Sequence, residues 1–190
     1  MKSYIKTGVT LFLICAVCSI LCGIVNHITA PVIADNQKKT DLEALSAVSG
    51  GLFPGDSKDL SGANGINSVT PLYKDEDLKE LAGYSLNLTG KGYGGEFTII
   101  ASYYLDGSII SAKMTSNSET AGLGKKAEND WYMAMFTGQG TSKPIASSKN
   151  DLGESDAAIV SGATITFNGV SKALRAGSEY VKGGANGISH

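Results

Sequence analysis

The sequence has 190 residues, which is long enough for one soluble domain of ordinary size and a membrane anchor. Its net charge of −2 comes from mixed charges, which excludes the strongly basic surface typical of nucleic-acid binding. All three cysteines lie within the first 22 residues, which excludes a disulfide framework and a thiolate metal site in the later chain. The sequence has two histidines, and a Ser-His-Asp triad is excluded as well. Redox chemistry therefore needs a cofactor.

The N-terminal stretch is the most apolar part of the chain. Residues 7–34 contain no Asp, Glu, Lys or Arg, and Gly8–Ile28 is long enough to cross a bilayer as a helix. Lys2 and Lys6 precede it, which predicts a cytoplasmic N-terminus. A cleaved signal peptide, cut after Val32-Ile33-Ala34, is the alternative. One face of the helix carries three cysteines that we expect to serve as small packing residues: Cys15, Cys18 and Cys22.

A short amphipathic pattern follows this apolar stretch. Residues 35–48 place three apolar side chains on one side of a helix: Leu42, Leu45 and Val48. We expect Pro31 to mark the point where the membrane helix gives way to this stalk, and Gly50-Gly51 to end the stalk. Residues 50–71 are rich in Gly, Ser, Asn and Asp and are predicted to be loop.

Three β-strands are predicted in the middle of the chain, after a short helical turn at Asp75–Leu81. The strands are Gly83–Leu88, Glu96–Leu105 and Ser108–Thr115. Asp106-Gly107 separates the last two strands, and this dipeptide between two β-rich runs is a strong hairpin signal. An antiparallel sheet is therefore expected here.

A loop with the sequence Ser-Glu-Thr-Ala-Gly-Leu-Gly follows the hairpin at residues 118–124. It precedes a predicted helix over Lys125–Phe136, in which we expect Trp131 to be a core residue. The spacing Gly122-x-Gly124-x-x-Ala127 also fits a dinucleotide fingerprint. The preceding hairpin, and the lack of a following parallel strand that ends in an acid, argue against that interpretation.

Residues 156–170 are predicted to form a short strand, a tight turn and the first turn of the last helix. The turn holds three small residues that allow close backbone approach: Ser161, Gly162 and Ala163. Either Thr164 or Thr166 is suited to cap the helix, and a helix N-terminus favours an anion. A phosphate bound near Thr164, or esterified to it, is one interpretation, and an ordinary helix cap is the other. We expect the helix to stop at Gly183-Gly184, before a loose tail.

Three motifs together resemble the FMN-binding domain family, which includes the G subunit of the Rnf electron-transport complex and the C subunit of the sodium-pumping NADH:quinone reductase. Ser161-Gly162-Ala163-Thr164 is similar to the family's Ser/Thr-Gly-Ala-Thr flavinylation motif. Residues 118–124 resemble its Glu-Thr-Pro-Gly-Leu-Gly loop, with Ala121 in place of Pro, and Tyr93-Gly94-Gly95 also matches. The resemblance covers most of residues 80–182 and the anchor, in the family's own order.

The resemblance implies that Thr164 carries FMN through a phosphoester made by a separate flavin transferase. Ala158 stands where the family usually has Asp, and Asp156 is the nearest acid. Ser161, Gly162 and Ala163 would surround the attachment point. The implied contacts to the flavin ring or ribityl chain come from the other loop: Glu119, Thr120, Gly122, Leu123 and Gly124. For Glu119 a solvated loop carboxylate is the alternative, and for Trp131 flavin stacking is the alternative to a core position.

The predicted fold is α+β: one N-terminal transmembrane helix, then one extracytoplasmic FMN-binding domain with an antiparallel sheet and flanking helices. The expected divisions are 1–7 cytoplasmic, 8–28 transmembrane, 29–70 stalk and loop, and 71–190 FMN-binding domain. The resemblance implies a single-pass component of an Rnf-type complex in the cytoplasmic membrane, with other membrane and soluble subunits as partners. In such a complex, electron transfer between ferredoxin and NAD is coupled to sodium or proton movement. The alternatives are a stand-alone anchored flavoprotein reductase, the C subunit of a sodium-pumping quinone reductase and a non-redox binding module.

Overall fold

The computed structural model describes residues 2–60 and 62–184, and the predicted loose tail lies outside these residues. The chain divides at Thr40 into two compact units. Helix α1, Lys2–Val48, is continuous and contains Pro31. The expected passage from membrane helix to stalk at Pro31 therefore involves no break in the helix, because a proline removes only one backbone hydrogen bond and the turns on either side remain helical.

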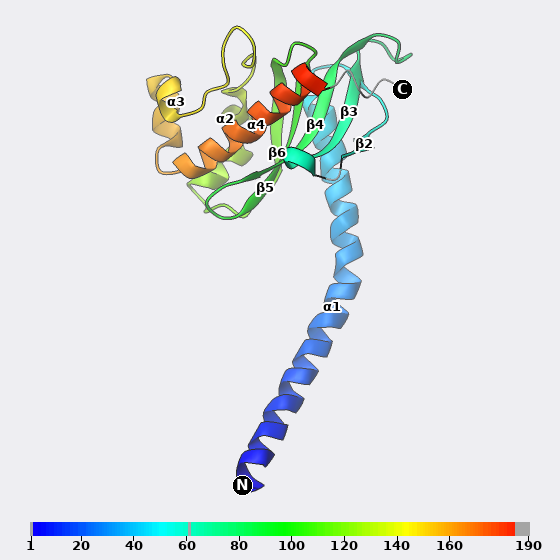
Figure 1. The fold of residues 1–190 in the computed structure, drawn as a ribbon, viewed down its shortest axis with the longest axis vertical. Helices are drawn as coiled ribbons and strands as arrows, with labels where there is room; N and C mark the ends of the chain where they lie inside the picture. The colour runs from blue at the N-terminus through cyan, green and yellow to red at the C-terminus, as the bar shows by residue number, and fades with distance from the viewer. Residues whose placement is uncertain (1, 61, 185–190) are drawn as a thin grey trace. The chain divides into compact units, whose positions relative to one another are not determined.

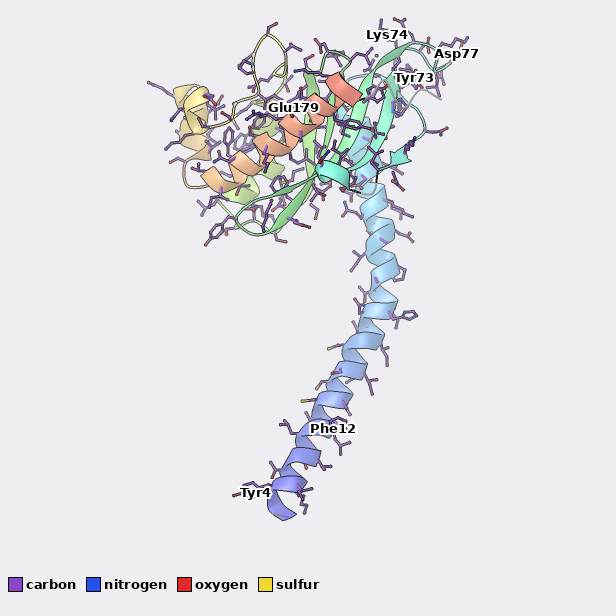
Figure 2. All side chains as sticks on the ribbon, in the orientation of Figure 1. Tyr4, Phe12, Tyr73, Lys74, Asp77 and Glu179 are labelled. Atoms are coloured by element: carbon purple, nitrogen blue, oxygen red, sulfur yellow. The ribbon has the colours of Figure 1, made fainter. Side chains whose placement is uncertain are left out.

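In the first unit α1 is apolar and its side chains project outward, as Tyr4 and Phe12 illustrate (Figure 2). Within the residues that the structure describes, α1 is the one helix whose length and composition allow it to cross a membrane. An uncovered apolar surface of this length is what a bilayer-spanning helix presents.

A six-stranded antiparallel sheet forms the centre of the second unit (Figure 1). The strand order is β1-β3-β4-β5-β6, and β2 also pairs with β3. The strands are β1 Phe53–Pro54, β2 Lys58–Asp59, β3 Ile66–Tyr73, β4 Leu81–Lys91, β5 Glu96–Tyr104 and β6 Ile109–Ser116. The three predicted strands and the antiparallel arrangement are confirmed, and the predicted strands correspond to β4, β5 and β6.

Two sequence-based expectations before β4 are wrong. Ile66–Tyr73 is strand β3 and not loop, because it pairs along its length with β4. Its polar residues and Pro71 gave no strand signal in the sequence. Asp75–Leu81 is a turn and not helical: the Asp75 carboxylate accepts the backbone N–H of Lys79 at 2.8 Å. In the predicted hairpin, Gly107 adopts a φ of 81°, as the Asp-Gly pair requires.

Four helices or helical turns follow the sheet before the last helix: η2 Gly124–Glu128, α2 Asp130–Ala134, η3 Lys149–Asp151 and α3 Glu154–Val160. A further turn, η1, spans Ala63–Gly65 ahead of β3. The predicted helix over Lys125–Phe136 is therefore divided, because Asn129 between η2 and α2 has extended backbone angles (φ −79°, ψ 139°). The last helix, α4, spans Thr164–Gly184 and ends where it was predicted to end.

The main core lies between α4 and one face of the sheet (Figure 1). Helix α4 contributes Phe167, Val170, Leu174 and Val181, and the strands contribute Leu86, Leu88, Phe97, Ile99 and Tyr103. A Cβ at Gly169 would lie 3.1 Å from the carbonyl carbon of Lys91. The glycine thus lets the start of α4 approach β4 closely, which places Thr164 beside the sheet's end.

The last turns of α1 lie on the opposite face of the sheet, within the second unit. Ala44 and Val48 form a small buried cluster with Ile100 of β5, and the Asn87 side chain donates a hydrogen bond to Asp41 at 3.2 Å. Of the three apolar side chains predicted on one side of this segment, Val48 is buried, Leu45 is half-buried and Leu42 is exposed. The predicted stop at Gly50-Gly51 is confirmed.

Candidate functional site

A tight turn delivers Thr164 to the start of α4. The Ser161 N–H donates to the Ala158 carbonyl at 3.3 Å, and the Ala163 N–H donates to that of Val160 at 3.0 Å. Gly162 has a φ of 88°, a conformation that favours glycine. The segment before the turn is helix α3 and not the predicted strand, because a short apolar run such as Ile159-Val160 fits either structure.

Thr164 is the first residue of α4, and its side chain is exposed. The first backbone N–H groups of a helix have no partner within the helix, and the helix dipole adds positive potential there. Ala163, directly before Thr164, is buried and its carbonyl accepts the N–H of Phe167 at 3.0 Å. The hydroxyl of Thr164 therefore stands at the kind of helix end that binds phosphate.

The loop at residues 118–124 is held by its own hydrogen bonds. The backbone N–H of Glu119 donates to the Asn117 side chain at 2.9 Å, and the N–H groups of Leu123 and Lys125 both donate to the Thr120 carbonyl. Gly122 has a φ of 77°, so its conformation favours glycine. The loop is thus a folded structure that presents Leu123 at the surface.

Glu119 is a buried carboxylate with two hydrogen bonds. Its side chain is 8% exposed, Oε1 accepts the backbone N–H of Gly94 at 3.0 Å, and Oε2 accepts the Thr166 hydroxyl at 2.7 Å. The alternative of a solvated loop carboxylate is therefore wrong. Because the Thr166 hydroxyl donates to Glu119, Thr166 connects α4 to the 118–124 loop.

Gly124 is required for space and not for backbone angle. A Cβ at this position would lie 2.6 Å from the Thr166 hydroxyl oxygen and would overlap the Glu119 carboxylate. Its φ is not in the left-handed region, unlike that of Gly122. Gly122 needs its glycine for the backbone angle, because a Cβ there would meet no atom within 4 Å.

The two motifs meet around one pocket of about 390 Å³. Its lining residues are Tyr93, Glu119, Thr120, Leu123, Gly124, Gly162, Ala163, Thr164, Ile165 and Thr166. Seven of these were candidate site residues in the sequence, whereas Ser161 and Gly122 do not line the pocket. The volume falls within the range of about 300–1,000 Å³ for small-molecule sites.

Tyr93 and Ile165 line the pocket although the sequence did not single them out as site residues. Both are exposed apolar or aromatic side chains, Tyr93 in the turn after β4 and Ile165 in the first turn of α4. Ile165 could have been found from the sequence, because it is an apolar residue at a helix start that lies outside the apolar stripe of the helix. Trp131, expected in the core, is 48% exposed and contacts the ring of Tyr132.

The pocket is neutral apart from one carboxylate. Glu119 is the one acidic side chain among the described residues that line the pocket, and none of them is basic. Tyr132 is buried, and its hydroxyl has no hydrogen-bond partner among the described residues. Burial raises the pKa of Tyr132, and the charge of Glu119 contributes a smaller part of the increase. Helix dipole and backbone N–H groups are therefore the pocket's means of holding an anion.

These features fit FMN. Gly162 and Gly124 leave room where a Cβ would approach Leu123 or overlap Glu119, Thr164 offers a hydroxyl, and the helix start suits a phosphate. Leu123, Ile165 and Tyr93 supply the apolar surface that a flat ring system needs. An α+β domain whose pocket combines an apolar surface with a helix start suited to an anion is of the class that binds nucleotide cofactors, and here it follows a helix whose length and composition allow it to cross a membrane.

Two family models match separate parts of the chain. Residues 92–179 match the FMN-binding domain, and residues 1–48 match the RnfG N-terminal region. The first match spans all three motifs that resembled this domain.

Curated relatives share sequence along most of the chain. One is the G subunit of the proton-translocating ferredoxin:NAD(+) oxidoreductase complex of Clostridium ljungdahlii, 25% identical over 88% of this chain and 85% of the relative. Another is the G subunit of the ion-translocating oxidoreductase complex of Vibrio atlanticus, 25% identical over 93% and 89%. NqrC of Shewanella oneidensis superposes with a TM-score of 0.45 at 19% identity, over 63% of this chain and 61% of that structure.

Proposed function

We propose that this chain is the G subunit of an Rnf-type ion-translocating ferredoxin:NAD oxidoreductase and carries FMN covalently on Thr164. The observation that carries the proposal is the convergence of residues 118–124 and residues 162–166 on one pocket, with Thr164 among its lining residues. The names and coverage of the curated relatives support the assignment to the complex. Bound FMN supplies the redox chemistry that the side chains lack.

Attachment requires an activated phosphate, and we propose a flavin dinucleotide as the donor, delivered by a flavin transferase. The Thr164 hydroxyl oxygen forms a bond to the phosphorus next to the flavin, and the phosphorus–oxygen bond to the second phosphate breaks. The nucleoside monophosphate leaves with the bonding electrons, and the hydroxyl proton passes to a base of the transferase. No oxidation state changes, and the product is a phosphothreonine ester.

The chain's own groups then divide the work of holding the cofactor. Free N–H groups at the start of α4 face the phosphate, which the dipole of this 21-residue helix also favours. Leu123 and Ile165, both exposed at the pocket, provide an apolar surface for the ring. One covalent bond leaves the ring's outer edge free to meet redox partners among the other subunits.

The location follows from α1 and from the charges before it. We propose that α1 anchors the protein in the cytoplasmic membrane and that the domain faces outward, because Lys2 and Lys6 precede the uncharged span. A covalent link keeps the cofactor from being lost to the medium there. Electron flow between ferredoxin and NAD, coupled to sodium or proton translocation, is the process that the protein serves.

The test is the intact mass of the full-length protein produced with and without a flavin transferase. We expect an added FMN-phosphoryl mass only with the transferase, located by peptide mapping on Thr164. Thr164→Val, which keeps the shape and removes the hydroxyl, abolishes the addition, whereas Thr137→Val on an exposed loop does not. A Thr164→Val protein that still holds FMN after acid precipitation would overturn the assignment.

A further inference from the structure

One carboxylate joins three segments that are distant in sequence. The loop residue Glu119 accepts the N–H of Gly94, in the turn between β4 and β5, and the hydroxyl of Thr166, in the first turn of α4. These two bonds take up both carboxylate oxygens at 3.0 and 2.7 Å. We call this set of contacts among Glu119, Gly94 and Thr166 the junction. Hydrogen bonds to a carboxylate are stronger than those between neutral groups, so the junction holds the three segments together.

The surroundings are shaped to admit this carboxylate. A Cβ at Gly92 would lie 3.0 Å from Cδ of Glu119 and would overlap Oε1, and a Cβ at Gly124 would overlap Oε2. Among the ion pairs of the described residues, none includes Glu119. The carboxylate is therefore held by neutral donors that are fixed in place, and its orientation is set by Gly94 and Thr166.

The junction acts directly on the turn that carries Thr164. Thr166 lies two residues after Thr164, and the backbone bond from Phe167 to Ala163 closes the same turn. The side chains of Thr164 and Ile165 are exposed and give this turn little anchorage. The bond from Thr166 to Glu119 thus ties the turn to the 118–124 loop.

We propose that Glu119 is a positioning residue: through Thr166 and Gly94 it fixes the first turn of α4 so that the Thr164 hydroxyl faces the pocket for phosphoester formation. This inference rests on the proposed attachment at Thr164. It assigns Glu119 a role away from the flavin ring, because both of its oxygens point into the junction. The ring contacts then fall to Leu123, Ile165 and Tyr93.

The experiment compares three full-length variants, two at Thr166 and one at Thr115. Thr166→Val removes the donor to Glu119 and keeps the shape, and Thr166→Ser restores the hydroxyl. Thr115→Val is the matched control, because the Thr115 hydroxyl is buried without a partner among the described residues. The flavinylation rate with purified transferase and flavin adenine dinucleotide is measured together with the exchange rate of the Gly94 amide proton in apoprotein.

We expect Thr166→Val to slow flavinylation roughly tenfold to a hundredfold, mainly in kcat, because a misplaced nucleophile reacts slowly after binding. The Gly94 amide should exchange about tenfold faster, while Thr166→Ser and Thr115→Val stay near the wild type. Equal flavinylation kcat and Gly94 exchange in Thr166→Val and the wild type would overturn the proposal. If even the wild-type protein gains no FMN, the proposed function fails, and the Gly94 exchange in apoprotein still decides whether the junction exists.

Discussion

The hydroxyl of Tyr103 in β5 donates a hydrogen bond of 3.0 Å to the backbone carbonyl of Leu174 in α4. Both residues are fully buried, and a Cβ at Gly177 would lie 2.5 Å from the same hydroxyl. The bond therefore sits at a point where α4 comes very close to the sheet. It fixes the position of α4 along its axis, and with it the helix start at Thr164.

Tyr103→Phe tests this contact. Removing the hydroxyl leaves the Leu174 carbonyl without its side-chain donor, so we expect the free energy of unfolding to fall by about 1–3 kcal/mol. The control is Tyr104→Phe at the neighbouring position, where the side chain is exposed and a change within about 0.5 kcal/mol is expected. Chemical unfolding of the full-length protein in detergent, followed by the fluorescence of Trp131, measures both. Equal losses in the two variants would contradict the assignment.

Buried tyrosines predict a loss of stability at alkaline pH. Burial raises the pKa of the Tyr103 hydroxyl, and burial together with Glu119 raises the pKa of Tyr132. In the unfolded chain tyrosine ionises near pH 10, so the unfolded state releases its protons first. Stability is therefore full below about pH 10 and falls above it by about 1.4 kcal/mol per pH unit for each such tyrosine.

Urea unfolding between pH 8 and 11 measures this slope, and the variants identify its source. Tyr103→Phe and Tyr132→Phe should each reduce the slope above pH 10, whereas Tyr104→Phe should leave it unchanged. A slope that persists in the double variant Tyr103→Phe/Tyr132→Phe would show that other groups cause the loss.

Restoring an acid at Ala158 should assist flavinylation. Ala158 is exposed in the last turn of α3, so an added carboxylate can reach an approaching enzyme. We expect Ala158→Asp to raise the flavinylation rate, although the acid near a helix C-terminus costs about 0.3–1 kcal/mol of stability. Ser155→Asp adds the same charge at an exposed position one turn earlier and serves as the control. Equal rates in the two variants would show that the position of the acid is unimportant.

Gly124→Ala should damage both stability and attachment. The added methyl group overlaps the Glu119 carboxylate and crowds the Thr166 hydroxyl, so we expect a loss of about 1–3 kcal/mol and slower flavinylation. Gly183→Ala in the last turn of α4 is the matched control, because a Cβ there meets open space and alanine favours a helix, so no loss of stability is expected. Thermal unfolding and intact mass provide the two readouts, and equal behaviour of the two alanine variants would contradict the structure of the junction.

The membrane orientation is tested with intact spheroplasts. If Lys2 and Lys6 remain in the cytoplasm, added protease digests residues 29–190 without lysis. A cytoplasmic protein of the same cells is the control for leakage. Protection of the domain until the cells are lysed would reverse the orientation.

Local signals explain what the sequence could predict about the fold. Asp106-Gly107 specified the hairpin because Gly107 adopts the positive φ that the turn between β5 and β6 requires. The apolar N-terminal helix was equally evident from composition. Asn129, in contrast, interrupts the predicted 125–136 helix, and Ile66–Tyr73 is a strand because of its neighbour β4. Pairing with β4 decided the second of these segments, and a single sequence does not display such pairing.

The site was predictable as motifs but not as an arrangement. Thr164 and the 118–124 loop were singled out because they resemble motifs of one family, and residues of both motifs line one pocket in the structure. The inward orientation of Glu119 was not foreseen, because its partners, Gly94 and Thr166, come from segments far apart in sequence. Whether FMN occupies the pocket stays a prediction.

Because α4 follows all six strands of the sheet in sequence, the proposed attachment at Thr164 depends on the order of biosynthesis. Every strand of the sheet is synthesised before α4, and the pocket has both of its walls only after α4 has packed on the sheet. An enzyme that recognises the assembled pocket therefore modifies finished domains and passes over incomplete ones. The fraction of molecules that carry the group at Thr164 would then report how many of them completed export and folding.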